Sequence, residues 1–106
     1  MEANVKDSNC TIVFTRGKPA GGSLKTIRLA IKHGKPCIHM DIQDVVLGRE
    51  MDVAMFLTGW LQRRHIQECV LNVAGSRESE APGIQKLIQQ IISWTLMWVN
   101  SPFTPQ

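Results

Sequence analysis

The stretch VLNVAGSRESEAPG, residues 70–83, decides the fold. Its apolar, β-branched run breaks at Gly75 into a small polar loop, and Pro82 predicts a helix start because Pro is favoured in the first helical turn. The segment therefore predicts a strand, an anion-sized loop and a helix. A helix N-terminus presents free N–H groups and a partial positive charge, so we expect a phosphate or another oxyanion at this point.

The same arrangement occurs earlier in the chain. Residues 10–15, CTIVFT, are apolar enough for a strand that is covered on both faces, and the Gly-rich loop 16–22 follows them. Ser23 is the expected N-cap of a helix that continues at helical apolar spacing to His33, with Gly34 in the C′ position.

A second short strand is expected over residues 37–42, with Asp41 near its end. Asp52 is the expected cap of a helix that ends near His65, and a further helix follows Pro82, apolar nearly all round between Ile91 and Val99. Strand and helix thus alternate three times. This predicts an α/β, Rossmann-like three-layer sandwich, with a short parallel sheet of about three strands and helices on both faces.

The composition fits one soluble globular domain. The chain has 106 residues, of which 43% are hydrophobic and 20% charged. We expect a lead-in over residues 1–9, a single truncated Rossmann-like ligand-binding domain over 10–100 and a tail over 101–106. The formal charge is +3, and residues 1–36 hold seven of the twelve basic side chains against two acidic ones. That imbalance suits an anionic small ligand, a weak nucleic-acid contact or simply a solvated helix face.

Nothing in the sequence indicates secretion or a metal site. The three cysteines are far apart and each opens an apolar run, which is typical of buried small hydrophobes in a reducing compartment: Cys10, Cys37 and Cys69. The N-terminus has no apolar signal core and no segment reaches about 18 apolar residues. A cytoplasmic protein without membrane contact is expected.

Two loops carry the candidate ligand-binding residues. Gly21, Gly22 and Ser23 would let a backbone approach a phosphate, although a plain turn with a cap uses the same residues. After the last strand the candidates are Gly75, Ser76, Arg77, Glu78 and Ser79. The Arg77 guanidinium would bind an anion through two N–H groups at once, and the alternative is a surface ion pair with Glu78 or Glu80. In a parallel sheet both loops lie at the carboxyl edge, where ligands bind.

Asp41 ends a strand at the same edge. It could accept a hydrogen bond from a ribose-type hydroxyl or a ring N–H, or it could cap a turn. His39 alternates with apolar neighbours within a strand and is more typical of a core histidine. The sequence contains no Ser/His/Asp order, no His-Glu-x-x-His pair and no Walker lysine motif, so no catalytic or metal-binding residue is predicted.

Residues 71–79, LNVAGSRES, resemble the putative molybdenum carrier family, whose pattern here is close to LNVAGPRES. Residues 13–17, VFTRG, the Gly21-Gly22-Ser23 turn, Thr26 and residues 33–41 are similar to the same family in the same order, so the likeness covers roughly residues 4–90. It implies membership of a Rossmann-like group that includes lysine-decarboxylase-like phosphoribohydrolases. It also implies that the two loops bind molybdenum cofactor (molybdopterin), a phosphorylated pterin dithiolene, or a nucleotide-like anion.

The chain departs from this family in two ways. Family members usually begin with another βα unit that carries a Gly-Gly-Gln-Thr-Gly-type loop, and we expect this chain to lack it. Such a loss would uncover a sheet edge or a helix face, so a homo-oligomer is predicted. Ser76 stands where the family usually has Pro.

The phosphoribohydrolase branch requires a catalytic Glu three residues after the Thr of a Pro-Gly-Gly-x-Gly-Thr loop. Arg28 stands at that position here, and a cation cannot act as the general acid or base. The sequence therefore favours a binding or carrier protein for a phosphate-bearing anion over an enzyme. The alternatives are a nucleotide-processing hydrolase of the phosphoribohydrolase type and a weak nucleic-acid-binding module, with nucleic acid the less favoured partner.

Overall fold

Helices and strands alternate along the chain, as the sequence predicts. The computed structural model describes residues 2–43, 49–63, 70–79 and 81–99. Its elements in chain order are α1 (Glu2–Lys6), β1 (Cys10–Thr15), α2 (Gly21–Lys32), β2 (Cys37–Asp41), α3 (Glu50–Arg63), β3 (Leu71–Gly75) and α4 (Ile84–Val99). The chain divides into two compact units: residues 1–44 with 69–85, and residues 45–68 with 86–106.

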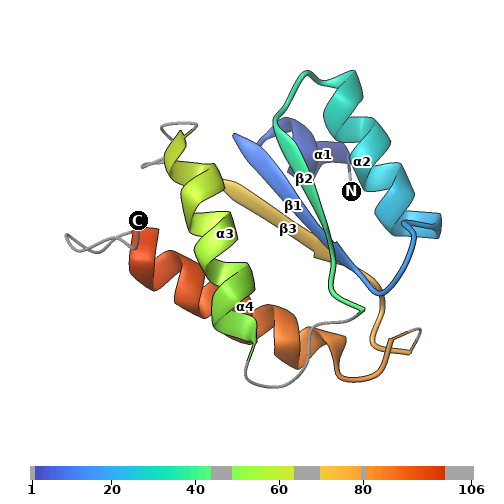
Figure 1. Cartoon of the computed structure of the whole chain (residues 1–106). Coiled ribbons are helices and arrows are strands. Elements are labelled where there is room, and N and C mark those ends of the chain that lie inside the picture. The colour runs from blue at the N-terminus through green and yellow to red at the C-terminus, as the bar shows by residue number, and fades with distance from the viewer. Residues whose placement is uncertain (1, 44–48, 64–69, 80, 100–106) are drawn as a thin grey trace. The chain divides into compact units, whose positions relative to one another are not determined.

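The first unit contains the sheet, whose three parallel strands have the order β2-β1-β3 (Figure 1). All six residues of the central strand β1 are buried, which confirms the prediction of a strand covered on both faces. Parallel strands flanked by helices give the Rossmann-like α/β class that the alternation predicts.

The strand register brings three loops to one edge. Thr15 at the end of β1 pairs with Asp41 at the end of β2, and Phe14 pairs with Gly75 at the end of β3. The loops that follow the strands therefore leave the sheet side by side at its carboxyl edge. Polar groups more than 50 residues apart in sequence can meet there.

Helix α2 packs on the sheet and begins earlier than the sequence predicts. Ala20, in extended conformation at φ −148° and ψ 164°, is the N-cap, so the expected Ser23 cap is wrong. The Ser23 N–H instead donates to the Ala20 carbonyl over 3.1 Å, which places Ser23 inside the first turn. Ser23 is buried on the inner side of the helix.

Within the expected polar lead-in over residues 1–9, residues 2–6 form the short helix α1. Val5 is fully buried and anchors this short helix, and the Ser8 hydroxyl donates to the Val5 carbonyl over 2.8 Å. The Glu2 carboxylate accepts hydrogen bonds from Lys32 at 3.1 Å and His33 at 2.8 Å at the end of α2. These bonds lower the pKa of Glu2, the one from His33 most.

The second unit contains α3 and the part of α4 from Lys86 onward. Helix α3 begins at Glu50, so Asp52 lies in the first turn and pairs with Arg49 at 2.9 Å, where the sequence predicts a cap. The Trp94 and Trp98 rings of α4 lie 5.4 Å apart at 40°. Trp94 and Met97 remain exposed. The predicted helix end at His65 lies outside the described residues.

Neither Cys10 nor Cys37 forms a disulfide; the first is buried and the second half-buried, while Cys69 lies outside the described residues. Burial raises the pKa of Cys37. Over the described parts of the chain, no helix is both long and apolar enough to cross a membrane. No group of three potential metal ligands occurs among the same residues.

Candidate functional site

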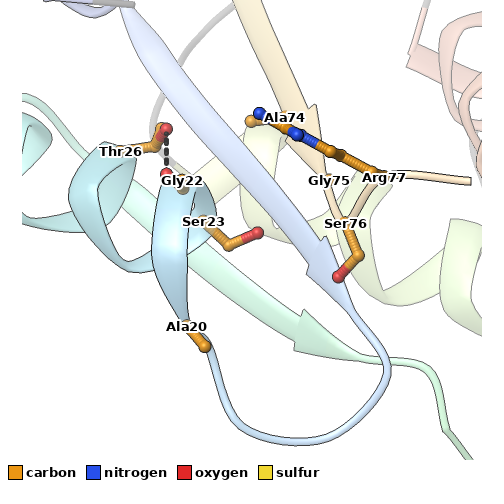
Figure 2. A pocket seen from close by; sticks show the side chains of 8 residues that line it. All are labelled: Ala20, Gly22, Ser23, Thr26, Ala74, Gly75, Ser76 and Arg77. Carbon is orange, nitrogen blue, oxygen red and sulfur yellow. Dashed lines mark hydrogen bonds between the residues drawn. The ribbon is translucent and has the colours of Figure 1, made fainter. Parts of the chain in front are cut away.

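A pocket of about 270 Å³ lies in the first unit, between the start of α2 and the end of β3. Its lining comes from two segments that are more than 45 residues apart in sequence: Ala20, Gly22, Ser23 and Thr26, and Ala74, Gly75, Ser76 and Arg77. Figure 2 shows the Ser23 and Ser76 side chains pointing toward one another from opposite sides. The two loops singled out in the sequence therefore meet.

The α2 side of the pocket is an uncapped helix start. Ala20 makes no side-chain cap hydrogen bond. The first amides of a helix have no partner within the helix, so an anion can bind to them when no side chain does. Gly21 has φ +52°, a left-handed conformation that glycine adopts without strain. The next residue, Gly22, lines the pocket without a side chain to obstruct it.

Ser23 and Thr26 project from the same side of α2, and their hydroxyls differ. The Thr26 hydroxyl donates to the Gly22 carbonyl over 2.9 Å (Figure 2). Ser23 is only 7% exposed, yet its hydroxyl makes no hydrogen bond to any residue that the structure describes. No fully buried side-chain oxygen or nitrogen among the described residues lacks a hydrogen-bond partner, so the Ser23 Oγ is open to the pocket, where it could donate to a ligand.

The β3 side of the pocket supplies the charge. The Ser76 N–H donates to the Phe14 carbonyl over 3.1 Å and so continues the strand pairing beyond Gly75. The Arg77 side chain runs back along β3 toward Ala74 (Figure 2). Within the described part of the chain, no ion pair or hydrogen bond engages its guanidinium, so a pair with Glu78 does not form. Glu80, the other suggested partner, lies outside the described residues.

Glu78 has a different role from its neighbour Arg77. Its carboxylate accepts hydrogen bonds from the N–H groups of Gly83 at 2.5 Å and Gln85 at 3.1 Å. These amides begin α4, where the sequence predicts a bound oxyanion. That expectation is wrong for α4, because a carboxylate of the protein itself takes the position.

Asp41 also binds backbone amides and does not line the pocket. One of its carboxylate oxygens accepts from the N–H groups of Gly17 at 2.8 Å and Gln43 at 3.0 Å. These bonds, the one from Gly17 first, lower the pKa of Asp41. Of its two predicted roles, the turn-capping one is visible in the structure. In the same region, His39 Nε2 lies 2.6 Å from the Thr15 hydroxyl, which itself donates to the Gly17 carbonyl.

Five of the predicted site residues line the pocket: Gly22, Ser23, Gly75, Ser76 and Arg77. Four do not: Gly21, Asp41, Glu78 and Ser79. The sequence interpretation also missed three lining residues: Ala20, Ala74 and Thr26. Helical spacing from Ser23 could have indicated Thr26, since residues i and i+3 share a helix face. Nothing marks two isolated alanines in a sequence.

The fold and the pocket define a small Rossmann-like protein with a pocket at the carboxyl edge of its sheet. Residues 1–96 match the circularly permutated YpsA SLOG family, and the chain belongs to that family. A search of curated proteins gave no significant match.

A solved structure supports the same relationship. The crystal structure of a putative molybdenum carrier protein from Syntrophus aciditrophicus superimposes on this chain with a TM-score of 0.77 and 35% sequence identity. The match covers 90% of this chain and 57% of the other. This chain thus spans little more than half the length of that relative. The family resemblance seen in the motifs is confirmed.

Proposed function

We propose that this protein binds and carries a small ligand with a phosphate group, held in the pocket at the carboxyl edge of the sheet. The observation that carries the proposal is that two serines and one arginine, from segments far apart in sequence, line a single pocket: Ser23, Ser76 and Arg77. Hydroxyls donate to phosphate oxygens, and the planar guanidinium fork binds two of them at once.

Two features of α2 support an anion rather than a neutral guest. Its N-terminus has no side-chain cap, and the helix dipole favours negative charge at that end. The Ser23 hydroxyl has no partner among the described residues and points into the pocket. A phosphate seated between Ser23 and Arg77 would satisfy all of these donors together.

The pocket size bears on which ligand fits. At about 270 Å³ it lies just below the roughly 300–1,000 Å³ of pockets that enclose a drug-sized molecule. It therefore suits the phosphate end of a larger ligand. Molybdenum cofactor and nucleotide-like molecules both have such an end, and the name of the solved relative favours the former. Ser23, Ser76 and Arg77 would hold the phosphate of either one.

Carriage is favoured over turnover by the side chains that line the pocket. Among these described residues there is no carboxylate, imidazole or thiol. Hydrolysis at a phosphoribosyl bond needs a group that can exchange a proton near neutral pH, and an arginine does not. The lining can bind and orient an anion without supplying a nucleophile or a base stronger than a serine hydroxyl.

The test is calorimetric titration of the purified chain with inorganic phosphate and with AMP. We expect both to bind, and Arg77→Ala to weaken both by about 10- to 100-fold, the cost of losing charge-assisted hydrogen bonds. Arg28→Ala is the matched control, because it removes the same charge from an exposed position outside the pocket. It should change affinity by less than about twofold.

Two results would contradict the proposal. Absence of phosphate and AMP binding would remove its basis, and an equal loss in Arg28→Ala would show that only overall charge matters. Native mass spectrometry of the protein from cells that make molybdenum cofactor then distinguishes the two ligand classes, since a pterin and a nucleotide differ in mass.

A further inference from the structure

The loop that presents Arg77 is fixed at both ends by hydrogen bonds within the first unit. At its start, the Ser76 carbonyl accepts from the Gln85 side-chain amide over 3.2 Å. At its end, the Gly83 and Gln85 amides donate to the two carboxylate oxygens of Glu78. The loop is therefore closed onto the first turn of α4.

Two further bonds involve described residues of this loop. The Ala81 N–H donates to the Arg77 carbonyl over 3.0 Å, which fixes the peptide that follows Arg77. The Arg16 guanidinium, at the end of β1, donates to the Pro82 carbonyl over 2.6 Å. The backbone at Arg77 is thus held by its own carbonyl and by the bonds of its neighbours Ser76 and Glu78, although the Arg77 side chain is exposed and has no partner among the described residues.

Resting on the proposed function, we infer that Glu78 is a positioning residue: by capping α4 it fixes the loop that aims Arg77 into the pocket. Its carboxylate is committed to two backbone amides and does not line the pocket. Long side chains lose conformational freedom when they bind, so a fixed backbone at Arg77 lowers the cost of closing its guanidinium on an anion.

This positioning role can be distinguished from a charge effect by whether the affinity for an anion falls or rises when Glu78 is replaced. A carboxylate next to Arg77 repels an anion, so removing its charge alone would strengthen binding. Loss of positioning weakens binding instead. Glu78→Gln removes the charge but keeps one acceptor oxygen for the amides, whereas Glu78→Ala removes both.

The experiment measures affinity for inorganic phosphate and for AMP in the wild type, Glu78→Ala and Glu78→Gln. We expect Glu78→Ala, which loses two hydrogen bonds to the backbone, to weaken phosphate binding about fivefold to tenfold. Glu78→Gln loses one of them, so its affinity for phosphate should stay within about twofold of the wild type. Asp7→Ala is the control for net charge, because Asp7 is an exposed carboxylate directly after α1. It should leave the affinity for phosphate unchanged.

Two outcomes overturn the inference. If Glu78→Ala binds phosphate as tightly as the wild type or more tightly, the carboxylate acts only through its charge. If AMP binding weakens while phosphate binding does not, Glu78 contacts the rest of the ligand directly and is a binding residue.

A readout that does not depend on binding keeps the inference separate from the proposed function. Hydrogen exchange at the Ala81 amide reports the bond to the Arg77 carbonyl in the free protein. We expect this exchange to accelerate in Glu78→Ala and much less in Glu78→Gln. Unchanged exchange overturns the inference even if phosphate binds, and a wild type that binds no phosphate contradicts the proposed function whatever the exchange shows.

Discussion

Two helix N-termini follow strands of the same sheet edge, and they differ in what occupies them. The α4 start is filled by the Glu78 carboxylate, which accepts from Gly83 and Gln85. The α2 start has no side-chain cap and borders the pocket. A helix start can bind a carboxylate of its own chain or an anion from solution, and at one site it cannot do both. The comparison teaches that the uncapped helix, not the more conspicuous Arg-Glu-Ser loop, provides the backbone part of the candidate anion site.

The largest effect is expected when α2 is given a carboxylate cap like the one that Glu78 provides for α4. Ala20 is exposed at the N-cap in extended conformation, the geometry in which Asp caps helices well. We expect Ala20→Asp to stabilise the fold by about 1 kcal/mol, because Asp is a far better N-cap than Ala. At the same time we expect phosphate affinity to fall on the order of 100-fold, since the new charge repels the anion and takes its amides.

Ala20→Asn separates the two effects, because it caps without charge. It should stabilise the fold similarly and weaken phosphate binding much less. Chemical denaturation and calorimetric titration of the three proteins provide the comparison. If Ala20→Asp bound phosphate as well as the wild type, the α2 start could not be the anion site.

The second prediction concerns the glycine before α4. Gly83 has φ +86°, where a side chain strains the backbone, and an added Cβ would lie 3.6 Å from an Arg16 nitrogen, an ordinary contact. We expect Gly83→Ala to destabilise the fold by about 1–2 kcal/mol through the backbone alone. Because the Gly83 N–H bonds to Glu78, phosphate affinity should fall as well.

Gly34→Ala is the matched control for this strain. Gly34 has φ +64°, and an added Cβ would meet nothing within 4 Å. It should cost similar stability in urea denaturation without weakening phosphate binding. Equal affinity losses in both variants would mean that binding follows global stability and not the loop after β3.

The third prediction uses the two hydroxyls on α2. Ser23→Ala removes a donor on the pocket wall that has no partner among the described residues, so we expect phosphate affinity to fall about 2- to 10-fold with little change in stability. Thr26→Val removes a hydroxyl that already donates to Gly22, so it should cost about 1 kcal/mol of stability and change affinity less. Paired titration and thermal unfolding measure both. If Thr26→Val weakened phosphate binding more than Ser23→Ala did, Ser23 would be excluded as a donor to the ligand.

Much of the fold was predictable from local pattern, and the sheet shows why. The run CTIVFT is apolar on both faces and ends in a Gly-rich loop, so both its burial and the position of its carboxyl end follow from sequence. The start of α2 did not follow, because Ser23 is a favoured N-cap and two glycines precede it, which conceals a helix that begins at Gly21. Helix α1 is too short, with one buried residue, to show a periodicity.

The candidate site was predictable in its glycines, serines and Arg77, because two polar loops after parallel strands must share an edge. The role of Glu78 was not. Its carboxylate reaches Gly83 and Gln85, five and seven residues ahead, across a Pro-containing turn. The capping signature that can be read from sequence spans only three residues. Only the folded turn shows that this acid caps α4.

The smallest expected effect concerns Asp41, which holds the loop after β1 as Glu78 holds the loop after β3. The hydrogen bond from the Gly17 N–H is the main cause that lowers the pKa of Asp41. The ionised Asp41 therefore stabilises the folded loop at pH values above the ordinary Asp pKa, and this stabilisation is lost as the pH falls through the lowered pKa. We expect the protection of the Gly17 amide, relative to its intrinsic exchange rate at each pH, to fall in acid, and Asp41→Asn to show little protection at any pH and to lose this dependence. Amide exchange followed by NMR from pH 6 to pH 3 measures it. If the Gly17 and Gly83 amides loosened together, the two loops would behave as one unit and not as two separately held halves of the pocket.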